Sequence, residues 1–254
     1  MAIVSLLGET NTFIVHEDAY YSLKDFKEDI RYHELRLKIA KEKGDRISEG
    51  CAYCYLGNTY YELKDFQKAI DYQARFLEVA KDLGDKNAEL RAYNNLGIAY
   101  CSLKDLKNSK DYHERSLKIA TEIGDRVQEG ISYLNLGNIY NCLRDFRKAI
   151  DYHERALKVA KETRDKLQEW NAYYSLGNDY DRLEDFKTSI NFRKSSLKIA
   201  KEVEDRSKEG LSCSGLGDCY YFLGDFKKSK DYYDRCLNIA KKVRKKGCRV
   251  NNLW

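Results

Sequence analysis

The 254-residue chain contains no proline, and it has no apolar run long enough to span a bilayer. Architectures other than helical ones normally need proline at their turns. Its absence, together with 34% charged residues and 21 tyrosines, therefore predicts helices throughout. The first residues, 1–15, lack a basic flank before their short apolar stretch, which disfavours a secretory signal. The composition predicts an all-α, cytoplasmic protein without a membrane span.

The eight cysteines do not have the spacing of a disulfide framework. Six of them are scattered through helical patterns: Cys101, Cys142, Cys213, Cys219, Cys236 and Cys248. A set of reduced thiols fits this spacing better. Cys51 and Cys54 form a lone C-x-x-C. One interpretation is a metal or redox role; the interpretation that we favour is that both cysteines simply lie on one face of a helix. We predict no cofactor and no metal.

The formal net charge of +5 is concentrated near the C-terminus. Six cations without an intervening acid lie there: Lys241, Lys242, Arg244, Lys245, Lys246 and Arg249. Without these six the charge is −1, so the body of the chain has no electrostatic footprint for nucleic acid. The basic segment is either a localisation or membrane-surface signal or, as we favour, a last helical turn whose cations suit the helix dipole.

A period of 40 residues runs through the chain. Glycines follow it without a slip at Gly57, Gly97, Gly137, Gly177 and Gly217, each after a leucine and three residues before a tyrosine. Aspartates from Asp25 to Asp225 and leucines from Leu37 to Leu237 keep the same register. The period predicts six units in a single solenoid over residues 1–243, with 12 helices and a basic tail over 244–254. The approximate units are 10–44, 45–84, 85–124, 125–164, 165–204 and 205–243, and the opening helix of the first is degenerate.

Each unit is predicted to form two helices. In the second unit, Asp45 caps the first helix, Asp65 caps the second, and Gly84 ends it in a left-handed conformation. A glycine inside a helix costs ~1 kcal/mol relative to alanine, so its repetition needs a structural reason. The pattern indicates a close helix crossing, in which Gly137 is expected to face Ala149.

This pattern resembles the tetratricopeptide repeat. The residues that carry the resemblance in the second unit are Tyr53, Leu56, Gly57, Tyr60, Ala69, Tyr72 and Leu77. The unit length, a Leu-Gly-Asn motif at 136–138 and a Gly-Asp-Arg motif at 124–126 are similar to those of the LGN/Pins group of polarity adaptors (G-protein-signalling modulators) and of the repeat array of tetratricopeptide repeat protein 28. The resemblance implies a right-handed superhelical solenoid that binds other proteins. Nothing after Lys242 resembles the G-protein-binding region of the adaptors, so regulation of Gα is not implied.

The first helices of such a solenoid line its concave wall, and one of their faces varies from unit to unit. This face is rich in amides, which both donate and accept hydrogen bonds and so can bind a peptide backbone. The resemblance assigns that role to Asn58, Arg91, Asn95, Asn135, Asn138, Asn178 and Arg182, and the same face adds Asn94, Asn141, Tyr174 and Asp181. We expect packing not to use Asn138 and Asn178. The alternative, that the asparagines are only solvated, is disfavoured because helix interiors disfavour asparagine and it recurs here.

Catalysis finds little support in the sequence. His33, His113 and His153 share one register of the second helices, each next to a tyrosine, which indicates a repeated packing position. No nucleophile has an identifiable base and no phosphate-binding loop is present, so we predict that the chain is not an enzyme. The predicted function is a cytoplasmic signalling scaffold or adaptor, whose groove binds an extended or helical segment of a partner protein. The alternative is an architectural array, either a fragment of a longer multidomain protein or one that self-associates through uncapped ends.

Overall fold

The computed structural model describes residues 26–250 of the chain, with side chains as far as residue 242. This part contains eleven helices and no strand: α2 (Phe26–Lys43), α3 (Arg46–Glu62), α4 (Phe66–Asp82), α5 (Lys86–Ser102), α6 (Leu106–Ile123), α7 (Arg126–Cys142), α8 (Phe146–Thr163), α9 (Lys166–Arg182), α10 (Phe186–Glu202), α11 (Arg206–Phe222) and α12 (Phe226–Val250). The predicted all-α fold is confirmed, with a helix count close to the 12 expected. None of the described helices is long and apolar enough to cross a membrane.

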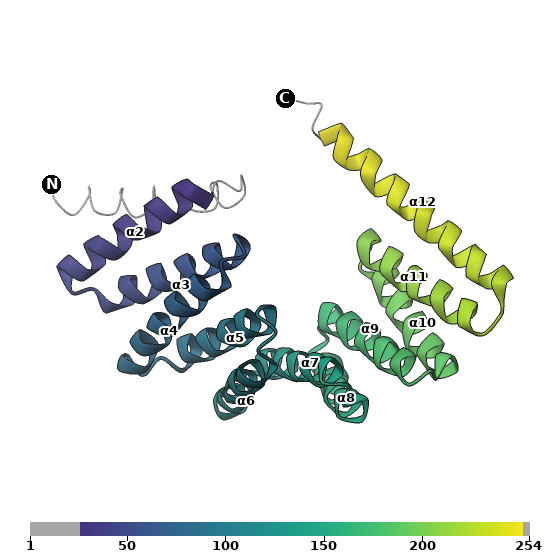
Figure 1. Cartoon of the computed structure of the whole chain (residues 1–254), viewed down its shortest axis with the longest axis horizontal. Coiled ribbons are helices and arrows are strands. Elements are labelled where there is room, and N and C mark those ends of the chain that lie inside the picture. The colour runs from purple at the N-terminus through teal and green to yellow at the C-terminus, as the bar shows by residue number, and fades with distance from the viewer. Residues whose placement is uncertain (1–25, 251–254) are drawn as a thin grey trace. The chain divides into compact units, whose positions relative to one another are not determined.

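The chain divides into two compact units, an N-terminal unit (Met1–Ile119) and a C-terminal unit (Ala120–Trp254). Within each, successive helices run in opposite directions and pack on their neighbours along the chain (Figure 1). In each hairpin we call α3, α5, α7, α9 and α11 the first helices, and α4, α6, α8, α10 and α12 the second helices. The single solenoid over residues 1–243 stays a prediction. The degenerate opening helix lies outside the described residues, and α12 continues to Val250, into the segment predicted as a tail.

Aspartates and left-handed residues set the ends of the helices. Asp45 and Asp65 each accept a hydrogen bond from the backbone N–H three residues later, and Gly84 has a φ of 65°. All three predicted roles are confirmed. Six other turns place a side chain in the same left-handed conformation: Lys64, Lys104, Arg144, Arg164, Glu184 and Glu204. Such a conformation is strained for residues other than glycine, so these turns are held by the flanking helices.

The periodic apolar face forms the core of the hairpins. The leucine before each glycine is 0–1% exposed: Leu56, Leu96, Leu136, Leu176 and Leu216. Burying such a side chain stabilises the fold by about 1.5–3 kcal/mol. The tyrosine three residues after the glycine stacks on an aromatic ring of the second helix, as Tyr60 does on Tyr72 with 5.4 Å between ring centres. The 40-residue spacing of these leucines and tyrosines therefore corresponds to one face of each first helix that packs against the second helix.

The glycines lie at close helix crossings, but the prediction that Gly137 faces Ala149 is wrong. The small residue of the second helix meets the glycine backbone, because the Ser109 hydroxyl donates to the Gly97 carbonyl at 2.8 Å. A Cβ added to Gly137 would instead overlap the imidazole of His153. The small residue lets the helices approach, and the long side chain one turn later fills the space that the missing Cβ leaves.

Candidate functional site

Each second helix from α4 onward places one long polar side chain beneath the glycine of its first helix. We call these the anchor residues: Gln73, His113, His153, Arg193 and Tyr233. All except Tyr233 are 1–4% exposed, and a buried polar group needs a hydrogen-bond partner. Three of them bond the residue that follows the glycine, on the predicted binding face: Gln73 to Asn58, Arg193 to Asn178, and Tyr233 to Asp218. Sequence analysis identified this register as a packing position but not its link to the groove.

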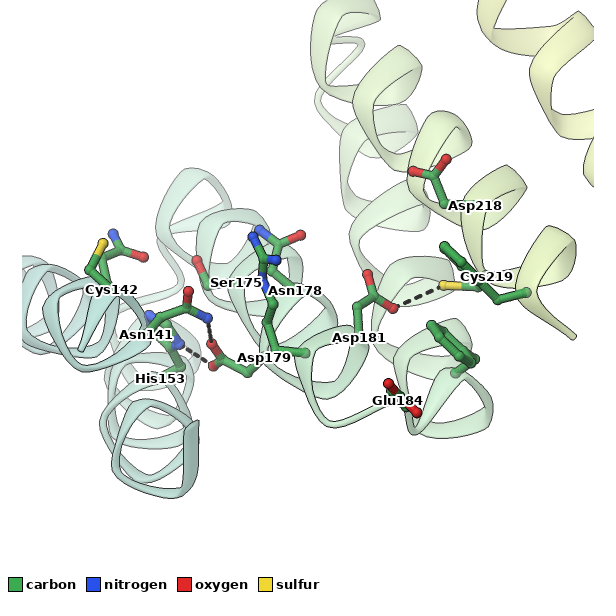
Figure 2. A pocket seen from close by; sticks show the side chains of 14 residues that line it. Asn141, Cys142, His153, Ser175, Asn178, Asp179, Asp181, Glu184, Asp218 and Cys219 are labelled. Atoms are coloured by element: carbon green, nitrogen blue, oxygen red, sulfur yellow. Dashed lines mark hydrogen bonds and ion pairs between the residues drawn. The ribbon is translucent and has the colours of Figure 1, made fainter. Parts of the chain in front are cut away.

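The C-terminal unit contains a groove of about 690 Å³ along α7, α9 and α11, which we call the C-terminal groove. Five of the predicted residues line it: Asn138, Asn141, Asn178, Asp181 and Arg182. Figure 2 shows Asn178 and Asp181 on α9, and Asp218 on α11 at the other side. Asn138 and Arg182 are exposed, and the other three are half-buried. The structure thus brings these residues together, while their role in binding stays a prediction.

A buried carboxylate, Asp179, lies at the bottom of this groove. It is 0% exposed, His153 Nδ1 lies 2.5 Å from its Oδ2, and the amide of Asn141 donates to its Oδ1 at 2.6 Å (Figure 2). Asn141 was predicted as a binding residue, but its amide nitrogen already donates a hydrogen bond to Asp179. Asp179 was missed by the sequence analysis. The sequence does contain a feature that could have indicated it, because Asp179 is an acid at a position where the other units carry Thr59, Ala99, Ile139 and Cys219.

A second network is centred on the buried guanidinium of Arg193. Its Nη2 donates to Asn178 Oδ1 at 2.9 Å and to the carboxylate of Asp181, which also accepts from the Cys219 thiol at 3.2 Å. Burial disfavours the charged guanidinium and is the largest single effect, but the charge and the hydrogen bond of Asp181, with smaller contributions from Cys219 and Tyr174, together raise the pKa of Arg193. The expectation that packing does not use Asn178 is therefore wrong, because Arg193 reaches it from beneath Gly177.

Asp218 and two phenylalanines form the α11 side of the C-terminal groove. The hydroxyl of Tyr233 donates to Asp218 Oδ1 at 2.6 Å, and this bond, with some burial, raises the pKa of Tyr233 to about 12. Phe186 and Phe222 are stacked with 4.9 Å between ring centres, and both line the groove. This side therefore combines an oriented carboxylate with aromatic surface.

The N-terminal unit has a smaller groove, of about 110 Å³, which we call the N-terminal groove. Two predicted residues line it, Asn58 and Asn95. Asn58 Oδ1 accepts from Gln73 Nε2 at 2.9 Å and from Asn95 Nδ2 at 3.3 Å. The two predicted asparagines are thus bonded to each other as well as to an anchor residue.

Four predicted residues lie outside the lining of both grooves. The guanidinium carbon of Arg91 lies 5.6 Å from the centre of the Phe76 ring, and Arg91 is exposed. Tyr174 is half-buried and stacks on the neighbouring tryptophan with 4.9 Å between ring centres. Asn94 and Asn135 are also half-buried. Tyr174 therefore takes part in packing.

The environment of the Cys54 thiol does not favour its reactive, deprotonated form. Burial raises its pKa to about 11, so it is protonated at neutral pH and is a poor nucleophile and metal ligand. Across the side chains that the structure describes, no group of three or more His, Cys, Asp or Glu residues could hold a metal ion.

The three histidines at the repeated register are 1–2% exposed, which confirms the packing prediction for His33, His113 and His153. Burial lowers the pKa of His113 to about 4, so the ring is neutral at physiological pH. The neutral ring of His113 therefore fills space between the helices of its hairpin.

Comparison with known protein families finds repeats over most of the described chain. The sequence profile of the Tetratricopeptide repeat family matches residues 88–162 and 169–242. A second profile with the same description matches residues 52–83. Together these segments cover more than half of the chain. Among curated proteins, none matches.

Several solved structures share the fold at low sequence identity. BtubC (BKLC) from P. vanneervenii is 22% identical with a TM-score of 0.77, over 86% of this chain and 92% of that one. The apo form of RapI is 14% identical with a TM-score of 0.73, over 93% and 99%. A Rap protein complexed with Competence and Sporulation Factor is 14% identical with a TM-score of 0.68, over 92% and 75%. At these identities the likeness establishes the fold alone.

Proposed function

Because the chain belongs to the tetratricopeptide repeat family, we propose that it is a protein–protein interaction scaffold whose C-terminal groove holds an extended segment of a partner protein. The family fold is generally a non-catalytic scaffold. The observation that carries the proposal is the bond from Arg193 to Asn178, which fixes a groove side chain from beneath.

This bond leaves the amide nitrogen of Asn178 as a donor for a ligand. Arg193 occupies the side-chain oxygen of Asn178, so the amide orientation is set before a partner arrives. An ordered side chain loses less entropy on binding than a mobile one. An extended segment offers backbone carbonyls at regular intervals, and each hydrogen bond to one contributes ~0.5–1.5 kcal/mol.

Two further observations support a binding role. A Rap protein with a similar fold has been solved with Competence and Sporulation Factor bound. The Leu-Gly-Asn motif at 136–138 supports kinship with the LGN/Pins adaptors and, with it, a role in cytoplasmic signalling. Regulation of Gα is not part of the proposal.

Selection from a random-peptide display library, followed by titration of the selected peptides, tests the proposal. The informative variant is Asn138→Ala with Arg182→Ala, because both side chains are exposed in the groove and their loss leaves the core intact. We expect it to melt like the parent and to bind the peptides roughly five- to a hundred-fold more weakly, from two lost hydrogen bonds.

A matched control separates the groove from the general surface. Arg147→Ala with Asn191→Ala removes the same two residue types from exposed positions outside the groove, and we expect parental affinity. Selected peptides that bind the groove variant as tightly as the control would contradict the proposal.

A second function is favoured by the exposed apolar face of α12. Leu237 is 51% exposed, whereas Leu197, at the same position of α10, is 8% exposed in a cluster that includes Leu216 of α11. We therefore also propose that α12 pairs with a helix of a second copy. Sedimentation equilibrium should show mass rising with concentration for the parent but not for Leu237→Lys. A parent that stays monomeric at all concentrations would contradict self-association.

A further inference from the structure

Two carboxylates of the C-terminal groove lack a cation within the described part of the molecule. Asp218 is exposed on α11, and its described contact is the hydroxyl of Tyr233, which orients it without neutralising it. Glu184 is exposed at the turn after α9 and lines the groove. Among the described residues, neither forms an ion pair. Both carboxylates therefore line the groove without a described counter-ion, on either side of Asp181 and Cys219 (Figure 2).

The other charges of the groove are largely balanced. Asp181 is paired with Arg193, and Asp179 is held by His153 and an amide. Arg182 is the cation of the groove lining that has no described ion pair. Because two unpaired carboxylates oppose one unpaired cation, the groove favours a positively charged ligand.

A buried acceptor adds to this preference. His153 lines the groove and is 1% exposed, and its Nε2 has no hydrogen-bond partner among the described residues. A carboxylate only accepts, so the proton of the neutral ring lies on Nδ1, towards Asp179, and Nε2 is an acceptor. The unsatisfied groups named so far on this lining therefore call mainly for a ligand rich in donors.

Aromatic surface accompanies the carboxylates. Phe222 lines the groove and is 64% exposed although it stacks on Phe186, so much of its ring surface remains open to a ligand. Asp218 and Phe222 are four residues apart on α11 and so lie on one face. Both depart from the repeat pattern: the equivalents of Asp218 are Asn58, Ile98, Asn138 and Asn178, and those of Phe222 are Glu62, Ser102, Cys142 and Arg182.

We propose that the α11 side of the C-terminal groove recognises an arginine side chain of the partner segment, with Asp218 and Glu184 as carboxylate acceptors and Phe222 as the stacking surface. This inference rests on the proposed binding function. A guanidinium carries donors only, matches a carboxylate with two parallel hydrogen bonds, and stacks flat on an aromatic ring. A lysine ammonium satisfies the charge but neither the planar stacking nor the fork geometry.

Binding of defined peptides, measured by fluorescence anisotropy, tests the inference. The probes are labelled octapeptides that alternate glycine with arginine, lysine or glutamate. We expect the arginine peptide to bind the parent most tightly, the lysine peptide more weakly and the glutamate peptide least. Asp218→Asn with Glu184→Gln should weaken the arginine peptide roughly tenfold or more, since charged hydrogen bonds are lost. The amide oxygen introduced by Asp218→Asn can still accept from Tyr233, so this variant is expected to fold.

The control variant is Asp231→Asn with Glu204→Gln. It removes the same charge, and Glu204 has the same left-handed turn conformation, with a φ of 54°, outside the groove. Arginine-peptide affinity at the parental level in this control supports the inference. Equal weakening in both variants, or a lysine peptide that binds as tightly as arginine, would overturn it. Tighter binding of the glutamate peptide, lost in Asn138→Ala with Arg182→Ala, would overturn arginine recognition while the groove function stands.

Discussion

Gln73 of the N-terminal unit and Arg193 of the C-terminal unit are anchor residues at the same position of their hairpins. Each donates to the asparagine beside the groove over 2.9 Å, Gln73 to Asn58 and Arg193 to Asn178. One anchor is a neutral amide and the other a charged guanidinium. The repeat backbone therefore accepts either, and the chemistry of the groove depends on which one it carries.

The charged anchor requires changes around it. Asp181, where the N-terminal unit has Tyr61, supplies the counter-charge for Arg193. Gly215, where the N-terminal unit has Asn95, makes room, because a Cβ there would overlap the guanidinium. Burial of an ion is favourable only with a close counter-ion and satisfied hydrogen bonds. These substitutions together allow a charged side chain, in place of an amide, to hold the asparagine that follows the glycine.

Removing each anchor should give the largest difference between the two units. Arg193→Met leaves the partly buried carboxylate of Asp181 without a counter-ion, at a cost of about 3–5 kcal/mol. Gln73→Met removes two neutral hydrogen bonds, to Asn58 and to the Cys54 carbonyl, at about 1–3 kcal/mol together. Native-state hydrogen exchange of α9–α10 and α3–α4 measures both. Adding Asp181→Asn to Arg193→Met should recover part of the loss, and similar costs in the two units would contradict the comparison.

Acid should destabilise the hairpin of His113 but spare that of Gln73. The pKa of His113 is about 4 in the folded chain, against an ordinary value of 6.5. Between these values the unfolded chain binds the proton and the folded chain does not, so stability is lost as pH falls from 6.5 towards 4. The loss reaches roughly 3 kcal/mol, at 1.36 kcal/mol per pKa unit. His113→Gln, which copies the other anchor, should flatten the pH profile of hydrogen exchange in α5 and α6; an unchanged profile would contradict the assignment.

Filling the space above an anchor should distinguish a rigid ring from a flexible amide. Gly137→Ala places a Cβ against the His153 imidazole, and overpacking of this kind costs ~1–3 kcal/mol. Gly57→Ala meets the Gln73 side chain, which can rotate away, and the helix propensity of alanine offsets ~1 kcal/mol. Thermal unfolding compares the two. Equal effects would show that the side chain beneath the glycine does not decide the cost.

The smallest effect concerns the turns that follow the second helices. Gly84 of the N-terminal unit and Arg164 of the C-terminal unit adopt φ values of 65° and 58° at the same turn position. Arg164→Gly relieves the left-handed strain and should stabilise by about 0.5–1 kcal/mol. Gly84→Arg should cost a similar amount. Calorimetric melting temperatures that move in the same direction would contradict this.

Predictions that depended on contacts within one helix or turn are confirmed. Asp45 and Asp65 cap helices through their own neighbours, and Gly84 is left-handed because the turn requires it. Predictions that depended on a contact between helices were less accurate. Asn178 was expected to take no part in packing, yet Arg193 forms a hydrogen bond with it. Asp179 was missed because its partner, His153, is distant in sequence.

The sequence by itself determined that this chain is a series of helical hairpins, because capping, helical periodicity and leucine burial are local or repeat identically in every unit. Tertiary structure decided what lies beneath each glycine and therefore which groove side chains are anchored. A long polar side chain crosses from one helix to another, and its partner depends on the distance between helices that only packing sets. Those crossings decide how Asn58 and Asn178 are held in the two grooves.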